Sequence, residues 1–313
     1  MQNFLICLYA IAPIFIIIGL GVLLKKVNIA DDNFTDKASD LVFKVILPVS
    51  LFYDIVTGKA EGNFEPVLIV WAVVFTFALF GLGLLLSKTS IVLGAGSRAA
   101  VAQGIFRSNY AILGLPLTRA IFGEGAAVTA SVILAVCIPL FNALAVVLIE
   151  TSLNKKAGLK KTLVNVLKNP LIIGVLCGCI YKVSGLPLPV LFEKTLGYID
   201  SMCMPLSFIV IGASMIFERV KEGFVPALIV SLIRTAVAPV ILISVAYAFG
   251  VRGEGLGILF IFTGSPAAIS GYIMMRKMGG DYDLAGNIVL ISTFLSFFTI
   301  LLGIWIMKNM GLV

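Results

Sequence analysis

The residues best suited to chemistry lie in two short segments that interrupt hydrophobic stretches. The first is Asn109–Pro116, which holds Gly114 and Pro116, and the second is Thr263-Gly-Ser-Pro266. Proline lacks an N–H group and glycine tolerates unusual backbone angles, so each segment is expected to break a helix. Broken backbone at membrane depth survives only where it is buried in protein or lines a wet cavity. We therefore predict a polar binding site where the two segments lie.

Eight residues in and beside these segments form the candidate substrate site. The amide of Asn109 offers two donors and one acceptor, so it either contacts a ligand or satisfies backbone groups freed by the break. The small and hydroxyl residues of the second segment either leave half-helix N–H groups open to a carboxylate or pack helices together. The candidate set is Asn109, Gly114, Pro116, Thr263, Ser265, Pro266, Ala267 and Arg107.

Charged residues inside hydrophobic spans are the second group of candidates, because charge in the bilayer is costly. Arg107 either binds a carboxylate or extends to the cytoplasmic surface. Arg234 lies nearer mid-span and is expected to bond a backbone carbonyl at a break, or the substrate. Asp54 and Asp200 are the candidates for proton coupling, and the alternative for each is a carboxylate near a span end.

The composition indicates an integral membrane protein and excludes most other classes. Of the 313 residues, 60% are hydrophobic and 12% are charged, and the mean hydropathy is +1.12. The net charge of +7 fits positively charged cytoplasmic loops better than nucleic-acid binding. There is no His, no metal-ligand spacing and no nucleophile–base pair, so we expect no enzyme, no cofactor and no metal.

Hydropathy predicts ten transmembrane helices in an all-α fold. Lys and Arg concentrate in the short loops of one side, which places both termini outside the cytoplasmic membrane. The expected spans are 4–24, 40–57, 65–87, 99–121, 125–150, 169–184, 190–217, 224–250, 254–277 and 284–307.

Prolines reveal an internal repeat. Four pairs occupy the same ordinal span in each half of the chain, at offsets of 157, 157, 160 and 150 residues. Five spans per half is an odd number, so the second half must be inverted relative to the first, as in many secondary transporters. The expected units are a first repeat at 1–150, a basic cytoplasmic linker at 151–168 and a second repeat at 169–313. The pairs are Pro13 with Pro170, Pro48 with Pro205, Pro66 with Pro226, and Pro116 with Pro266.

The stretch Asn109-Tyr-Ala-Ile-Leu-Gly-Leu-Pro-Leu-Thr-Arg-Ala-Ile-Phe-Gly123 resembles the fourth-span signature of the auxin efflux carrier (PIN-like) family. Leu47-Pro48, Asn169-Pro170 and Pro266 extend the resemblance along the chain, and the short central loop is similar to that of bacterial and archaeal members. The resemblance implies that spans four and nine are broken and cross in a transport domain of spans 3–5 and 8–10. Spans 1, 2, 6 and 7 would form a scaffold that often dimerises.

The expected function is secondary transport of a small organic anion by alternating access, in the direction of efflux or exchange. Bacterial members of the family that the sequence resembles are associated with anions such as malate or malonate. The alternative is a sodium-coupled symporter of the bile-acid type, which shares the inverted five-span plan. Coupling to protons or to sodium stays open at this stage, and the expected partners are the anion and the lipid bilayer.

Overall fold

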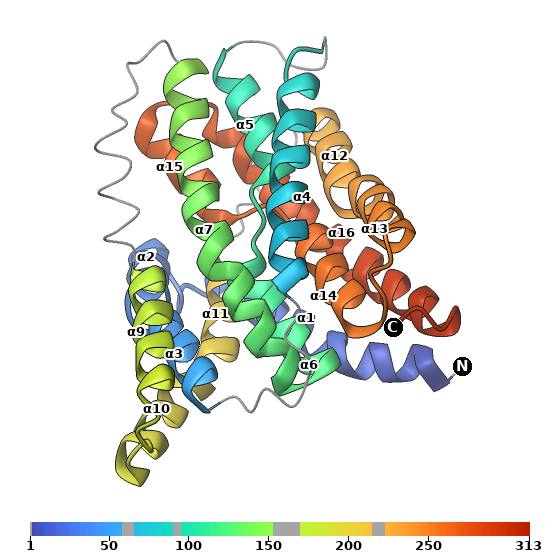
Figure 1. The fold of residues 1–313 in the computed structure, drawn as a ribbon. Helices are drawn as coiled ribbons and strands as arrows, with labels where there is room; N and C mark the ends of the chain where they lie inside the picture. The colour runs from blue at the N-terminus through green and yellow to red at the C-terminus, as the bar shows by residue number, and fades with distance from the viewer. Residues whose placement is uncertain (1, 58–65, 90–94, 153–169, 215–222) are drawn as a thin grey trace.

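The computed structural model describes residues 2–57, 66–89, 95–152, 170–214 and 223–313. In these ranges the chain is helical apart from turns, short connections and an isolated antiparallel bridge between Ser108 and Ala267 (Figure 1). The helix α4, with 21 residues, is about 31 Å long, enough to cross about 30 Å of hydrocarbon. The helices in the described ranges that are long and apolar enough to span a membrane are Pro66–Leu86, Glu124–Ile149, Val190–Ala213, Phe224–Ala248 and Tyr282–Asn309.

Helix occupies most of the described part of each expected span, although the inverted ten-span arrangement itself stays a prediction. The expected linker lies outside the described residues from residue 153 onward. Single helices are α1 (Gln2–Lys26), α4 (Pro66–Leu86), α7 (Glu124–Ser152), α9 (Pro170–Ser184) and α16 (Tyr282–Asn309). Consecutive pieces are α2 (Asp32–Leu41), η1 (Val42–Ile46) and α3 (Leu47–Thr57); α10 (Val190–Ser201) and α11 (Cys203–Ala213); α12 (Phe224–Leu232), η4 (Ile233–Val237) and α13 (Ala238–Ala248).

Two spans are interrupted, at residues that overlap in part with the segments that the sequence predicts. The fourth is built from α5 (Ala95–Phe106), η2 (Tyr110–Gly114) and α6 (Leu115–Phe122), so it breaks at residues 107–109 and is helical through Gly114 and Pro116. The ninth is built from α14 (Gly253–Gly264) and α15 (Ile269–Met278), so Thr263 is helical and the break is Ser265–Ala268.

A π-helical turn explains why Pro116 does not break its helix. Pro116 has no N–H group, and in a regular α-helix its ring would clash with the carbonyl four residues earlier. Here Leu115, the residue before it, donates its N–H to the Tyr110 carbonyl across the wider π turn. The turns η1 and η4 end in the same way, two residues before Pro48 and Pro239. The extra residue of each turn accommodates the proline inside a continuous helix.

The helices pack as two groups (Figure 1). One group joins α1 to α11 and α3 to α9 and α10, and the other joins α4 to α5 and α12 to α16; α1 also packs against α16 and so connects the two groups. Glycines make the closest approaches in the first group. An idealised Cβ on Gly212 of α11 would lie 2.0 Å from the Ile18 carbonyl oxygen of α1, and one on Gly174 of α9 would lie 2.4 Å from the Pro48 carbonyl oxygen of α3. Small residues at helix contacts are typical of membrane proteins.

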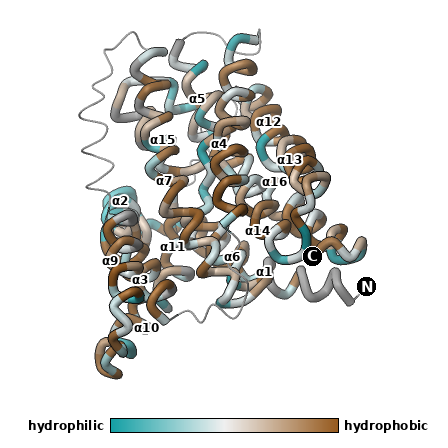
Figure 2. Tube along the Cα trace, in the orientation of Figure 1, coloured by the Kyte–Doolittle hydropathy of each residue, from teal (hydrophilic) through white to brown (hydrophobic). Residues whose placement is uncertain are grey.

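Hydrophobic residues run along most of the long helices (Figure 2), and many of their large apolar side chains are exposed. The side chains of Ile16, Val183, Leu191 and Phe249 are each at least 70% exposed. A soluble protein rarely exposes so much contiguous apolar surface, whereas lipid tails solvate it. The outer surface and the long apolar helices together indicate a multi-pass membrane protein.

Candidate functional site

The two helix interruptions meet and pair as short antiparallel strands. Ser108 lies opposite Ala267 in the isolated bridge. The backbone N–H of Asn109 donates to the Pro266 carbonyl at 2.8 Å, and the N–H of Ala268 donates to the Arg107 carbonyl at 3.0 Å. We call this meeting of residues 107–109 with residues 265–268 the crossing. Its hydrogen bonds pair several of the backbone N–H and C=O groups that each break frees. Such pairing is the condition for broken backbone inside a membrane.

Arg234 from η4 joins the ends of two interrupted helices. Its guanidinium is fully buried, and it donates from Nε to the Ser265 carbonyl at 3.1 Å and from Nη1 to the Ile105 carbonyl at 3.0 Å. These carbonyls belong to the C-terminal ends of α14 and α5. The sequence left open whether Arg234 bonds a carbonyl or the substrate, and the structure places it on two carbonyls.

Arg107 is buried beside the crossing and does not extend to the membrane surface, because its exposed fraction is 6%. Its Nη2 donates to Oδ1 of Asn142 in α7 at 2.6 Å, and its Nη1 lies 2.7 Å from Sδ of Met274 in α15. The surface-directed reading of Arg107 is therefore wrong. The packed α5–α7–α15 interface holds the side chain inside, where neutral groups solvate it.

The charges of the two arginines are balanced differently. Among the side chains that the structure describes, Arg107 and Arg234 are the only charged ones that are buried. Each helix C-terminus carries about −0.5 charge, so the ends of α5 and α14 offset about one positive charge beside Arg234. Arg107 has neutral partners, and the N-terminal ends of the η2–α6 segment and α15 add partial positive charge. The crossing thus has a positive surplus that suits an anion.

Buried polar atoms without hydrogen-bond partners lie near this positive charge. In the described part of the chain, Nδ2 of Asn109, Nη2 of Arg234 and both amide atoms of Gln103 are buried with no hydrogen-bond partner. Asn109 and Gln103 are each 3% exposed. Leaving a buried polar atom unpaired costs about 1–3 kcal/mol, so a ligand that pairs these atoms gains that free energy.

The remaining predicted residues of the crossing have local partners. The Ser265 hydroxyl donates to the Ile261 carbonyl and the Thr263 hydroxyl to the Leu259 carbonyl, both within α14. The Ala267 N–H donates to Oγ of Ser292 at 3.0 Å. An idealised Cβ on Gly114 would lie 2.0 Å from Cδ2 of Tyr110, so Gly114 allows close packing at the crossing. Thus Asn109 and Arg107 keep polar groups suited to a ligand, and the others build the backbone around them.

Of the two predicted coupling carboxylates, Asp200 contacts residues away from the crossing. Asp200 in α10 accepts a hydrogen bond from the Ser50 hydroxyl of α3, and its Oδ2 lies 3.5 Å from Nη1 of Arg119 at the far end of α6. The side chain of Asp54 lies outside the described residues. Proton coupling through either residue stays a prediction.

Sequence reasoning missed Gln103, Asn142 and Ser292. Gln103 lies four residues before Arg107, which directly follows the end of α5 and still donates its N–H to the Gln103 carbonyl, so the two polar side chains lie on one side of the chain. That spacing within an apolar span is a signal that the sequence contains. Nothing local connects Asn142 or Ser292 to the crossing, because α7 and α16 reach it only through tertiary packing.

Comparisons with known proteins match nearly the whole length of the chain. The family described as "Membrane transport protein" matches residues 6–305. An uncharacterized transporter of Methanothermobacter thermautotrophicus is 23% identical over 286 residues, which cover 91% of this chain and 93% of the relative. An uncharacterized transporter of Methanocaldococcus jannaschii is 23% identical over 307 residues, which cover 95% of this chain and 97% of the relative.

Proposed function

This chain belongs to the membrane transport protein family, which includes the auxin efflux carriers, and from that premise we propose that it is a secondary carrier of a small organic anion. The anion carries a carboxylate and crosses the cytoplasmic membrane by alternating access, as efflux or exchange. It binds where the two interrupted helices cross, near Asn109 and Arg107.

The observation that carries the proposal is the uncompensated buried cation at the crossing. Arg107 is 6% exposed and its partners, Asn142 and Met274, are neutral. A buried charge without a counter-charge is strongly unfavourable. A carboxylate supplies both the missing negative charge and the acceptor oxygens that the unpartnered Nδ2 of Asn109 lacks.

The proposed architecture is two inverted repeats of five spans, with both termini outside. Support comes from the two groups of helices and from the pairing of two interrupted helices in opposite halves of the chain. In this arrangement α1, α3, α9, α10 and α11 belong to a scaffold, and the helices of the crossing belong to a moving transport domain. The exposed apolar faces of α9 and α10 offer the scaffold a surface for a homodimer.

The same geometry disfavours the alternative, a sodium-coupled symporter of the bile-acid type. A sodium ion at the crossing would lie near the Arg107 guanidinium and near the N-terminal end of α15, and both repel a cation. A proton gradient is the coupling that fits better, because it needs no cation site beside these groups.

Uptake into proteoliposomes tests the proposal. Purified protein is expected to take up radiolabelled malate, malonate or an aromatic carboxylic acid with saturation and counterflow, and without a requirement for sodium. Saturation and counterflow separate a carrier from a channel. Uptake of organic cations with no uptake of any carboxylate would overturn the proposal.

A further inference from the structure

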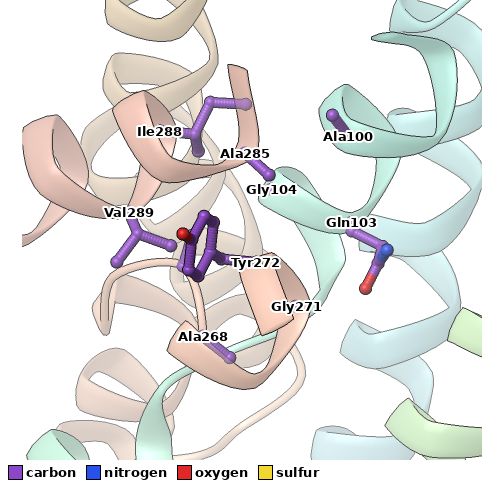
Figure 3. Close-up of a pocket in the computed structure, with 10 residues that line it drawn as sticks. Ala100, Gln103, Gly104, Ala268, Gly271, Tyr272, Ala285, Ile288 and Val289 are labelled. Carbon is purple, nitrogen blue, oxygen red and sulfur yellow. The ribbon is translucent and has the colours of Figure 1, made fainter. Parts of the chain in front are cut away.

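A small cavity lies between α5, α15 and α16, beside the crossing and inside the proposed transport domain. Its volume is about 10 Å³, which is room for one water-sized group. The residues around it are mostly small, and Figure 3 shows Gln103 on α5 together with Ala268, Gly271 and Tyr272 of the α15 region. Gln103 is the polar side chain of this lining that is almost completely buried, and side-chain packing alone does not explain its burial.

Gln103 brings an unsatisfied amide to the cavity. The side chain is 97% buried, and neither Nε2 nor Oε1 has a hydrogen-bond partner among the described residues. An idealised Cβ on Gly271 would lie 3.4 Å from Oε1 of Gln103 and 3.7 Å from Cδ of Arg107. The amide, the base of the guanidinium side chain and the first turn of α15 therefore meet at this point.

The N-terminal end of α15 borders the same cavity, with Ala268 and Gly271 in its lining. The N-cap residue Ala268 makes no side-chain hydrogen bond to this turn. The N–H of Ala268 donates to the Arg107 carbonyl and the N–H of Gly271 donates to the Ala268 carbonyl, so this helix end acts on the cavity through the charge of about +0.5 that a helix N-terminus carries. Ala267, Ala268 and Gly271 have no bulky side chain that would separate this helix end from the cavity. Together with Arg107, this environment favours an oxygen of an anion and disfavours a cation.

We propose that this cavity is the subsite for one carboxylate oxygen of the transported anion, with Gln103 as a specificity-determining residue. The amide turned with Nε2 toward α15 donates to that oxygen, and the partial positive charge at the N-terminal end of α15 stabilises it from the opposite side. The cavity admits one oxygen, so the rest of the anion lies outside it. This inference rests on the proposed function of the crossing.

Two variants of Gln103 separate a ligand contact from a structural role. Gln103→Met keeps the volume and removes both polar atoms, and the Michaelis constant for carboxylate uptake is expected to rise about tenfold because one charge-assisted hydrogen bond is lost. Gln103→Glu places a carboxylate in the subsite itself, so uptake is expected to fall to background while thermal stability is kept or raised. Thr76→Val, at a buried hydroxyl that bonds within α4, is the matched control and keeps the wild-type Michaelis constant.

The measurements are uptake of radiolabelled malate and malonate into proteoliposomes, and thermal shift with acetate against chloride at equal ionic strength. Wild-type protein that transports a carboxylate, together with a Gln103→Met variant whose Michaelis constant and acetate shift are unchanged, overturns the subsite and leaves the proposed function intact. Wild-type protein that transports no carboxylate overturns the proposed function, and the subsite falls with it.

Discussion

At the scale of single residues, the crossing separates polar groups that build the backbone from polar groups that remain for a ligand. Arg234 donates two hydrogen bonds, to the Ser265 and Ile105 carbonyls, whereas Nδ2 of Asn109 has no partner in the described chain. Arg107 lies between these cases, because it has partners but no counter-charge. The residue-scale predictions follow from this difference.

Asn109→Ala is expected to abolish most transport without lowering thermal stability. The substitution removes an amide nitrogen that bonds nothing in the described structure, while the Asn109 backbone N–H still donates to the Pro266 carbonyl. Specific uptake per folded protein and melting temperature are measured together. A drop in melting temperature with normal specific uptake would show that the amide is structural.

Ala267→Leu and Arg107→Gln compare the two sources of positive potential. The leucine would fill the space beside the first turn of α15 and is expected to block anion uptake, because a half-helix N-terminus stabilises an anion by up to about 2 kcal/mol. Arg107→Gln is expected to weaken uptake, because it removes the positive charge while the new amide can still donate to Oδ1 of Asn142. Normal transport by Ala267→Leu beside a stable but inactive Arg107→Gln would assign the anion to Arg107 alone.

At the scale of elements, helix ends and helix contacts decide the shape of the crossing. The π turns keep η1–α3, η2–α6 and η4–α13 continuous through prolines, and glycines allow α1 and α11 to approach closely. Both features act through backbone geometry, so their loss is expected to lower the stability of the protein more than it lowers its affinity for the ligand.

Arg234→Met is expected to destabilise the protein strongly, by about 2–4 kcal/mol. The substitution leaves the carbonyls of Ile105 and Ser265 buried without their donor. Arg234→Lys should recover only part of the loss, because one ammonium does not reproduce the two directions of the guanidinium. Melting temperature in detergent reports the effect. Equal stability of Arg234→Met and the wild type would rule out the clamp.

Gly212→Ala is expected to separate α1 from α11 and to cost about 1–3 kcal/mol of stability. Its Cβ would lie 2.0 Å from the Ile18 carbonyl oxygen, which belongs to the backbone and cannot turn aside. Gly81→Ala in α4 is the control, since its Cβ would meet nothing within 4 Å. Thermal unfolding of both variants measures the difference, and equal melting temperatures would contradict the predicted clash.

At the scale of the whole molecule, a charged cluster links the two groups of helices. Arg119 at the end of α6 lies 3.1 Å from Glu124 and 3.5 Å from Asp200 of α10, and Ser50 of α3 donates to the same Asp200. The Arg119 and Asp200 side chains are each only 14% exposed. If the helix groups move relative to each other during transport, this contact breaks and re-forms in each cycle.

Charge exchange tests that link. Arg119→Asp is expected to reduce uptake, because it places two carboxylates against each other, and the double variant Arg119→Asp with Asp200→Arg should restore part of the uptake. Transport rates in proteoliposomes at equal protein amounts give the comparison. Independent losses that add in the double variant would mean that the two residues do not act as a pair.

The sequence by itself determined the membrane class, the positions of the hydrophobic helices and the existence of two interrupted spans. Hydropathy and the missing N–H group of proline are local properties, so they can be read from neighbouring residues. The family resemblance is also confirmed by the family match over residues 6–305, and the sequence could reveal it because its signature residues are contiguous from Asn109 to Gly123.

Only the tertiary structure decided where the breaks lie and what fills the crossing. A π turn moves the fourth-span break upstream of Gly114 and Pro116, because the wider turn bonds around the proline. The pairing of Ser108 with Ala267, the two carbonyl partners of Arg234 and the unpartnered amide of Gln103 join segments from distant parts of the chain. Which buried polar atoms find partners depends on packing across α5, α7, α14, α15 and α16, and no local pattern of residues specifies that packing.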